Sequence, residues 1–269
     1  RASRQTGSTA AAWGSFMNSD KSLDALRREI DSIDDAIHNQ LMRRADLTEQ
    51  IRDVKGSGAI ALRPGREAEI LRRLVARHKG IFPKPSLVRI WREIFAANVS
   101  LQGPFSLAVF TPAEGGDGYL DLARDQFGSY APMTGHESSY RVIDLVTRGQ
   151  AAVGIMPLPQ PDDAAPWWPH LVGEGKNSPR IVARLPFAGP ANGRGRDLEG
   201  LAISRLAQEE TGADCTFIAV DSEAKIDPPM LRRAFAKASL KATVIAFWSD
   251  NPGGPWLHLA EIEGFIAPD

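Results

Sequence analysis

The first strong pattern along the chain is a helical repeat of apolar residues between residues 21 and 55. This segment contains no Gly or Pro, and its apolar residues recur every three or four positions over about ten turns of helix. Lys55 lies in the expected last turn, where a cation is favoured, and Gly56 ends the repeat. A helix of this length cannot bury its apolar stripe alone, so we expect partner helices or a second subunit. The stripe consists of Leu23, Leu26, Ile30, Ile33, Ile37, Leu41, Ile51 and Val54.

Two further helices are predicted before residue 103. One covers residues 64–78 and begins at a proline, which is tolerated in a first turn; the other covers residues 85–101. Gly103 and Pro104 stop the second of these helices and mark a domain boundary. The inward positions are Ile70, Leu71 and Leu74 in the first helix, and Leu87, Ile90, Trp91, Ile94 and Phe95 in the second.

After Pro104 the pattern changes to short apolar runs, with helical patterns between some of them. Strands that alternate with helices indicate an α/β or α+β region. The fold class expected from the whole chain is therefore an all-α N-terminal domain of three helices plus a C-terminal α/β (α+β) region. The expected strands cover residues 105–110, 151–156, 180–187, 216–220, 243–248 and 256–262, and the expected helices cover residues 118–127, 138–148 and 229–240.

These patterns divide the chain into a helical domain, an α/β region and a C-terminal βαββ segment. The first 16 residues lack both an initiator Met and the apolar stretch of a secretory signal, so we interpret residues 1–17 as a disordered leader or an expression remnant. Without an export signal, the expected location is the cytoplasm. The predicted domains cover residues 18–103, 105–205 and 206–269.

Composition excludes several classes of protein. No apolar run approaches the roughly 20 residues that span a bilayer, so no membrane association is expected. The single cysteine, Cys215, excludes an intramolecular disulfide and fits a reducing compartment. The five histidines show no metal-ligand spacing, so we expect no metal and no cofactor.

Charge is distributed unevenly along the chain. Residues 21–93 hold 16 Lys and Arg against 11 Asp and Glu, although the whole chain has a net charge of -1. A positive helical segment suits a small anionic ligand or a nucleic acid, while an ordinary solvated surface is the alternative.

Several polar residues fall on the faces that the apolar pattern assigns to the interior. Arg44, Thr48 and Lys55 continue the stripe of the long helix to within roughly 40°. Glu67 shares the inward face of the second helix, and Asn98 and Gln102 extend the inward face of the third. Interior charges are costly unless something pairs them, so together these side chains predict a pocket for a compact anion.

Each of these residues also has an ordinary structural interpretation. The two cations can reach solvent along their own aliphatic stems. Glu67 lies in the expected first turn of the second helix, where the positive end of the helix dipole favours a carboxylate. The two carboxamides can belong to a fraying helix end.

The run LDALRREIDSIDDAIHNQLMRRADLTEQIRDVK resembles the first helix of the all-α chorismate mutases. The similarity continues through RPGREAEILRRL to NVSLQG and covers about 85 residues without a large gap. It implies that Arg27 and Arg44 hold the substrate carboxylates, and that Lys55 and Gln102 donate to the ether oxygen.

The same resemblance assigns the remaining site residues. Glu67, next to Arg66, contacts the substrate hydroxyl, and Asn98 takes a position often held by Ser. Arg63 is a departure, because some members carry an Asp there. The resemblance implies the substrate chorismate and an intertwined homodimer, and no nucleic acid partner. Because Arg27 precedes Arg44 by about 25 Å along one helix, two antiparallel long helices are needed to bring them together.

The second half resembles, more faintly, the region that follows this mutase in bifunctional mutase–prephenate dehydratases. The run GIMPLP lacks the Glu, Asn and Ser of the corresponding family strand, and Thr216-Phe217 lacks the arginine of the Thr-Arg-Phe signature. We therefore expect no dehydratase activity. Residues from Cys215 onward resemble part of an ACT domain, which implies an aromatic amino acid effector. The alternatives are a bifunctional mutase–dehydratase, and a helical dimerisation module without catalysis.

Overall fold

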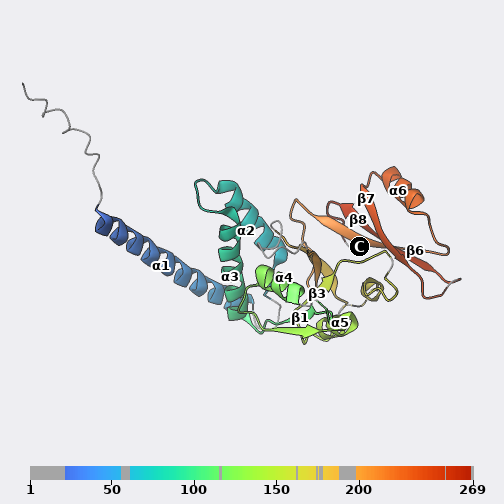
Figure 1. Cartoon of the computed structure of the whole chain (residues 1–269), viewed down its shortest axis with the longest axis horizontal. Helices are drawn as coiled ribbons and strands as arrows, with labels where there is room; N and C mark the ends of the chain where they lie inside the picture. The colour runs from blue at the N-terminus through green and yellow to red at the C-terminus, as the bar shows by residue number, and fades with distance from the viewer. Residues whose placement is uncertain are drawn as a thin grey trace, which may run out of the picture. The chain divides into compact units, whose positions relative to one another are not determined.

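The computed structural model describes residues 22–55, 61–114, 117–161, 163–173, 175, 178–187, 198–251 and 253–267 (Figure 1). The side chain of Lys55, the predicted leader (residues 1–17) and the predicted helix end at Gly56 lie outside the described residues. The chain forms two compact units, residues 1–51 and residues 52–269. These units group the second and third helices with the α/β region, while the functional boundary at residue 103 stays a prediction.

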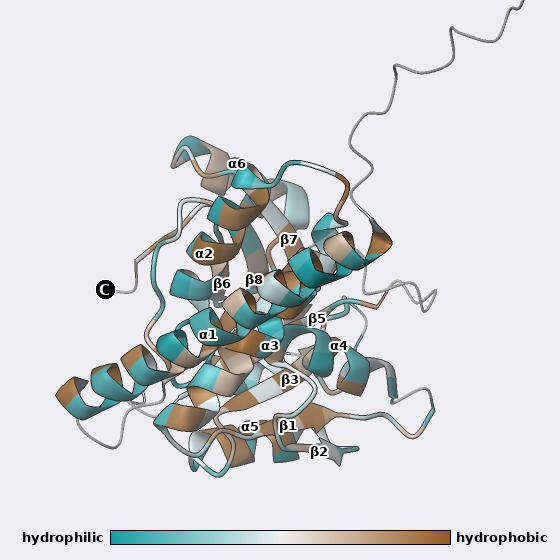
Figure 2. Ribbon diagram, turned by 90° about the vertical axis from the view of Figure 1, so that its left-hand side faces the viewer, coloured by the Kyte–Doolittle hydropathy of each residue, from teal (hydrophilic) through white to brown (hydrophobic). Residues whose placement is uncertain are grey.

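The predicted long helix is confirmed as α1, Leu23–Lys55. Its apolar residues recur along the whole helix, which alternates between hydrophilic and hydrophobic turns in Figure 2. Most of the large apolar side chains of the stripe are exposed in the single chain, so the second subunit expected as one possible partner of the stripe stays a prediction. They include Leu23, Leu26, Ile30, Ile33, Ile37, Ile51 and Val54.

The second unit begins with a helical hairpin. Helix α2, Pro64–Arg77, and helix α3, Lys84–Gln102, match the predicted helices to within one residue at each end. The two helices pack against each other through Leu71 of α2 and a buried stripe of α3. That stripe follows the helical period and consists of Arg92, Phe95, Ala96 and Val99.

A mixed five-stranded sheet follows, in the order β2-β1-β3-β5-β4. Strand β1 pairs in parallel with β2 and β3, whereas β5 pairs antiparallel with β3 and β4. Helices α4 and α5 are the crossovers that parallel pairing requires. The strands are β1 Leu107–Phe110, β2 Met133–His136, β3 Val153–Pro157, β4 Arg180–Leu185 and β5 Gly200–Ser204.

Helices cover both faces of this sheet. On one face, Leu107 and Val109 pack with α4, Asp117–Phe127. On the other face, Ala108 packs with α5, Ser139–Thr147. This division follows from the alternation of side chains along a strand.

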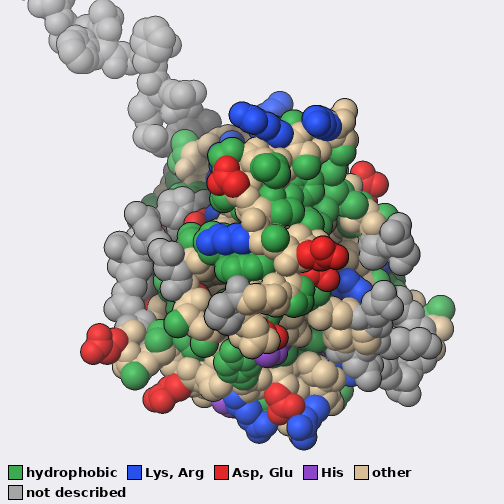
Figure 3. All heavy atoms as spheres, turned by 90° about the vertical axis from the view of Figure 1, so that its right-hand side faces the viewer, with side chains coloured by type: hydrophobic (Ala, Val, Ile, Leu, Met, Phe, Trp, Pro, Cys, Tyr) green, Lys and Arg blue, Asp and Glu red, His purple; other side chains and the backbone are tan. Residues whose placement is uncertain are grey.

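The C-terminal segment forms a three-stranded antiparallel sheet in the order β6-β8-β7. Strand β8 lies between two strands that are joined through α6, which is the arrangement of a split βαβ unit. This confirms the predicted βαββ order. Seen from the side of Figure 1 on which α6 and β7 lie, the surface shows hydrophobic side chains next to charged ones (Figure 3). The elements are β6 Cys215–Ser222, α6 Pro228–Lys237, β7 Ala242–Trp248 and β8 Trp256–Glu263.

Two strands and one short helix were not predicted from the sequence. Strand β2 is a short edge strand, and only its first residue, Met133, is a large apolar residue. Strand β5 begins at Gly200, the last residue of a glycine-rich stretch typical of loops, yet all five of its residues are buried. The short helix is a 3-10 turn, Trp168–Leu171, which follows the buried Trp167.

Candidate active site

The predicted site residues of α1 fall in both units. Arg27 is exposed and pairs with Asp24 one turn earlier, at 3.5 Å. The hydroxyl of Thr48 donates to the carbonyl oxygen of Arg44 at 3.0 Å, which is a contact within the helix. Lys55 is the last residue of α1 and belongs to the second unit, as do the predicted residues of α2 and α3. Arg27 and Arg44 therefore remain predicted site residues whose relation to the rest is not described.

Within the second unit, the last turn of α1 meets the last turn of α3. The guanidinium of Arg52 donates through Nη1 to the carbonyl oxygen of Leu101 at 3.1 Å. Arg52 precedes Lys55 by three residues, and Leu101 directly precedes Gln102. This contact places the turns that carry the two predicted ether-oxygen donors next to each other.

The two carboxamides of α3 donate to carbonyl oxygens of their own helix. Asn98 Nδ2 donates to the oxygen of Ile94 at 2.5 Å, and Gln102 Nε2 donates to the oxygen of Asn98 at 3.1 Å. Both side chains are half-buried, and the two residues lie one helical turn apart on α3. A ligand at this end of α3 would take these donors in exchange for contacts within the helix.

Glu67 lies in the first turn of α2 and is 8% exposed. Its Oε2 accepts a hydrogen bond from Nη1 of Arg92 at 2.9 Å, in an ion pair that joins α2 to α3. Arg92 is only 2% exposed, and burial lowers the pKa of its guanidinium while the charge of Glu67 opposes that effect. The carboxylate predicted to meet the substrate hydroxyl is thus fixed by a buried cation.

Sequence reasoning missed Arg92, although a signal for it exists. Arg92, Phe95 and Val99 recur at helical spacing on the buried face of α3. A cation in an otherwise apolar stripe predicts a buried anionic partner, because an unpaired charge there is costly. The sequence alone did not identify Glu67 as that partner.

The other two cations predicted at the start of α2 have protein partners. Arg63 pairs with Glu209 at 2.7 Å, and Arg66 pairs with Glu69 at 2.9 Å. Arg63 therefore contacts the segment that leads from β5 to β6, which is consistent with its departure from the family pattern. Both ion pairs are largely exposed, so each contributes little to stability.

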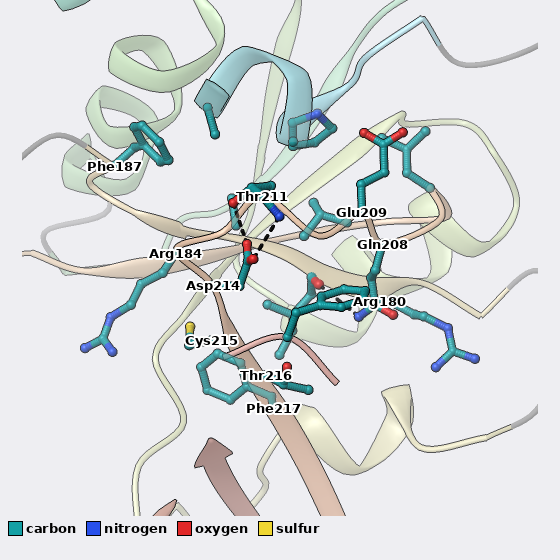
Figure 4. Close-up of a pocket in the computed structure, with 18 of the residues that line it drawn as sticks. Arg180, Arg184, Phe187, Gln208, Glu209, Thr211, Asp214, Cys215, Thr216 and Phe217 are labelled. Atoms are coloured by element: carbon teal, nitrogen blue, oxygen red, sulfur yellow. Dashed lines mark hydrogen bonds between the residues drawn. The ribbon is translucent and has the colours of Figure 1, made fainter. Parts of the chain in front are cut away.

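A cavity of about 1110 Å³ lies within the second unit, between α2, α3, β4 and β6. Many of its charged side chains are paired across it or with the backbone. Arg72 donates to the oxygens of Thr211 and Ala213, and Asp214 accepts from Thr211 and Gly212. Figure 4 shows Thr211 and Asp214 joined by hydrogen bonds at this wall. These pairs hold α2 to the segment that precedes β6.

The described residues contain no group of three or more His, Cys, Asp or Glu side chains that could hold a metal ion. None of the helices in the described part of the chain is long and apolar enough to cross a membrane.

A long amphipathic helix followed by a helical hairpin, with amides and a buried carboxylate on the faces of the hairpin, defines a helical region joined to an α/β region. Residues 26–103 match the family model described as chorismate mutase type II. The resemblance of the helical segment to the chorismate mutase family, an isomerase family, is thereby confirmed.

Curated relatives carry the same kind of segment. A bifunctional chorismate mutase/prephenate dehydratase of Aquifex aeolicus (strain VF5) is 37% identical over 95 residues, which cover 34% of this chain and 26% of that protein. The protein of the same name from Neisseria gonorrhoeae is 36% identical over 86 residues, which cover 32% of this chain and 24% of that protein. The one from Pseudomonas aeruginosa is 27% identical over 149 residues and is covered to 40%. The chain thus spans well under half the length of these relatives.

A solved prephenate dehydratase from Streptococcus mutans aligns with 59% of this chain and 82% of its own, at a TM-score of 0.38 and 13% identity. A likeness this weak decides nothing about the fold or the function of the α/β region.

Proposed function

We propose that this protein is a chorismate mutase, which converts chorismate to prephenate in aromatic amino acid biosynthesis. The observation that carries the proposal is the chorismate mutase type II match of residues 26–103, together with the contact of Arg52 with Leu101. That contact supports the assignment because it joins the two helix ends that carry the expected donors, Lys55 and Gln102.

The reaction is a [3,3] rearrangement within one molecule, so it needs neither a nucleophile nor a general base. A site accelerates it by holding the flexible substrate in its compact conformer, which removes an entropic cost. Fixed donors then stabilise the negative charge that grows on the ether oxygen as its bond to carbon breaks. We assign those donors to Lys55 and Gln102.

The remaining site residues hold the substrate. Arg27 and Arg44 bind its two carboxylates, because a planar guanidinium makes paired, charge-assisted hydrogen bonds. Glu67 accepts a hydrogen bond from the substrate hydroxyl, and the neighbouring Arg66 is a further substrate-binding residue. Asn98 adds a polar contact to the substrate, and Arg63 stands where the family pattern has an acidic residue.

The active species in this proposal is a homodimer. Large apolar side chains of α1 are exposed in the single chain, and a second copy would bury them. Arg27 lies more than four turns from Arg44 along α1, so it serves the site of the partner subunit. In this proposal, the apolar stripe of α1 forms the dimer contact, and the arginines of the same helix form part of the active site.

The first test replaces the cation at the end of α1. We expect Lys55→Ala to lower the rate of chorismate loss, followed by absorbance, about 10²–10³-fold, the scale of removing one preorganised donor. Lys79→Ala removes a lysine from the loop between α2 and α3 and should leave the rate unchanged. Near-normal turnover by Lys55→Ala would contradict the assignment.

The second test asks whether the site is shared. Mixing inactive Arg27→Ala and Lys55→Ala chains should restore activity, because one of the two sites in each mixed dimer then has both residues. A mixture that forms heterodimers and stays inactive would show that Arg27 acts within its own chain.

The βαββ order of the C-terminal sheet favours a second, regulatory function. An ACT-like segment of this order is expected to bind an aromatic amino acid as an effector. Calorimetry with phenylalanine, tyrosine and tryptophan tests this, and the absence of heat at millimolar ligand would remove it. We expect no conversion of prephenate to phenylpyruvate, and turnover of added prephenate would favour the bifunctional alternative. We propose a cytoplasmic location for the enzyme.

A further inference from the structure

The buried ion pair between Glu67 and Arg92 is a polar contact of the described core that the proposed mechanism leaves unexplained. Glu67 is 8% exposed and Arg92 is 2% exposed, and the pair is 2.9 Å long. Ion pairs of this kind rarely gain stability over an apolar pair of the same size. A pair that joins α2 to α3 next to a site carboxylate is therefore better explained by what it does to the site.

The contacts of Arg92 favour the ionised form of Glu67. Nη1 donates to Glu67 Oε2, while the buried Nε has no hydrogen-bond partner. The ring of Phe187, just after β4, lies 4.8 Å from the guanidinium carbon of Arg92. An aromatic face over a cation attracts it and also keeps water away from the ion pair. The α/β region thus supplies one wall of this contact.

Other charged groups near Glu67 are already paired. On α2 itself, Arg63 pairs with Glu209 and Arg66 pairs with Glu69. On α3, Arg89 pairs with Asp125 of α4, and Glu93 accepts from the backbone of Ser129. Also on α2, Arg72 donates to backbone oxygens and to the Thr211 hydroxyl of the segment before β6. Arg92 is the buried cation whose ion pair with Glu67 joins α2 to α3.

We propose that Arg92 is a positioning residue for the mutase reaction: it fixes the orientation of the Glu67 carboxylate and keeps it charged, so that the carboxylate accepts the hydroxyl of the substrate. The proposal rests on the proposed mutase function. Arg92 acts through Glu67 and touches no substrate atom. Phe187 completes the arrangement from the α/β region.

Removing the charge of Arg92 has a consequence that a purely structural role would not produce. A buried carboxylate without its cation has a raised pKa, because burial disfavours the charged form. Glu67 would then be protonated at mildly acidic pH and could no longer accept the hydrogen bond. Below the raised pKa, kcat/KM should fall about tenfold for each pH unit.

The experiment measures kcat/KM for chorismate between pH 5 and 9, as roughly the range over which such a shift is visible. In the pH profile of kcat/KM, the acidic limb is the part in which the value falls as pH decreases. This limb should move toward neutral pH in Arg92→Leu and in Arg92→Gln, the second of which keeps an amide donor and disturbs packing less. Arg92→Lys should keep the limb near that of the unchanged protein. Arg89→Leu removes a paired arginine one turn earlier on α3 and is the matched control, with no shift expected.

The double variants complete the test. In a Glu67→Gln background there is no carboxylate to titrate, so adding Arg92→Gln should cause no shift of the limb. If the unchanged protein fails to turn over chorismate, the mutase function itself is wrong. If it is active and the limb of Arg92→Gln does not move, or moves equally in the Glu67→Gln background, the role of Arg92 is wrong.

Discussion

Large apolar side chains are exposed along helix α1 but buried in the five-stranded sheet. In α1, Ile30 and Ile37 are 57% and 54% exposed. In the sheet, Ile155, Leu201 and Ile203 have no exposed surface. The sheet buries its apolar residues with helices of the same chain, whereas in the proposed homodimer the stripe of α1 gains its burial energy from a partner. One region is complete within a single chain, and we propose that the other is completed by assembly.

The largest expected effect is on α1, the proposed subunit contact. Ile37→Glu places a charge in the centre of the α1 stripe, where burial of an unpaired charge is strongly unfavourable. We expect the dimer to dissociate and chorismate turnover to fall at least about tenfold, since Arg27 then cannot reach the partner's site. Sedimentation analysis and the chorismate assay measure the two consequences.

The control for this change lies on the other side of the helix. Asn39 follows Ile37 by two residues and lies about 180° around α1 from Ile30 of the stripe. Asn39→Glu therefore adds the same charge outside the stripe. It should leave both assembly and turnover intact. A dimer that tolerates Ile37→Glu would show that α1 is not the subunit contact.

The second prediction tests the region that is complete within one chain. Leu201 lies in β5 and has 0% exposure, so Leu201→Ala leaves a cavity between the sheet and α5. The free energy of unfolding should fall by about 2–5 kcal/mol, with assembly of the folded protein unchanged. Urea unfolding measures the loss. Met230→Ala, at a side chain that is 64% exposed, should cost less than about 0.5 kcal/mol.

The same contrast explains how far the sequence predicted the fold. Helix α1 and strand β8 were found because their apolar residues recur with a clear period. Strand β2 has one large apolar residue, Met133, and strand β5 begins at Gly200, so neither shows a period. Their place in the sheet is set by pairing with distant strands, which a local pattern does not contain.

The candidate site divides in a similar way. The polar residues on the inward helix faces, together with the family resemblance, predicted that the ends of α1 and α3 belong to one site, and the Arg52 contact with Leu101 joins the same two ends. The pair of Glu67 and Arg92 was not predicted, because 25 residues separate its members. Only the packing of α2 on α3 selects one partner among several arginines.

The third prediction concerns the polar contacts that hold the second unit together. Although burial by itself would raise the pKa of Asp214, hydrogen bonds from Thr211 and Gly212 and the charge of Arg72 lower it below its usual value. A lowered pKa means that the ionised carboxylate stabilises the fold above the unfolded-state pKa of about 3.9 and that this contribution is lost as pH falls through the folded-state pKa.

We expect Asp214→Asn to lower the free energy of unfolding by about 1–2 kcal/mol at pH 7, the difference between charged and neutral hydrogen bonds. It should also flatten the decline of stability with acid below pH 4, roughly where Asp214 takes up its proton. Urea unfolding at several pH values measures both effects. An unchanged acid slope would show that Asp214 does not titrate with unfolding.

The smallest expected effect comes from two serine N-caps, one at the start of α1 and one at the start of α5, which covers the five-stranded sheet. Ser138 Oγ accepts from the backbone N–H of Arg141 at the start of α5, and Ser22 Oγ accepts from that of Ala25 at the start of α1. Replacing either serine by Ala removes a capping hydrogen bond worth about 1 kcal/mol. Ser138→Ala should lower the free energy of unfolding by that amount at every protein concentration, because α5 packs within its own chain.

Ser22→Ala should behave differently, because in the proposed dimer α1 is stabilised chiefly by the partner helix. Its cost should appear as weaker dimerisation, so that the midpoint of unfolding falls most at low protein concentration. Measuring both variants over a hundredfold range of concentration, roughly enough to shift a dimer equilibrium by 2.7 kcal/mol, separates the two responses. Equal, concentration-independent losses would mean that α1 is already folded and stable within a single chain, and the contrast between the two regions would no longer hold.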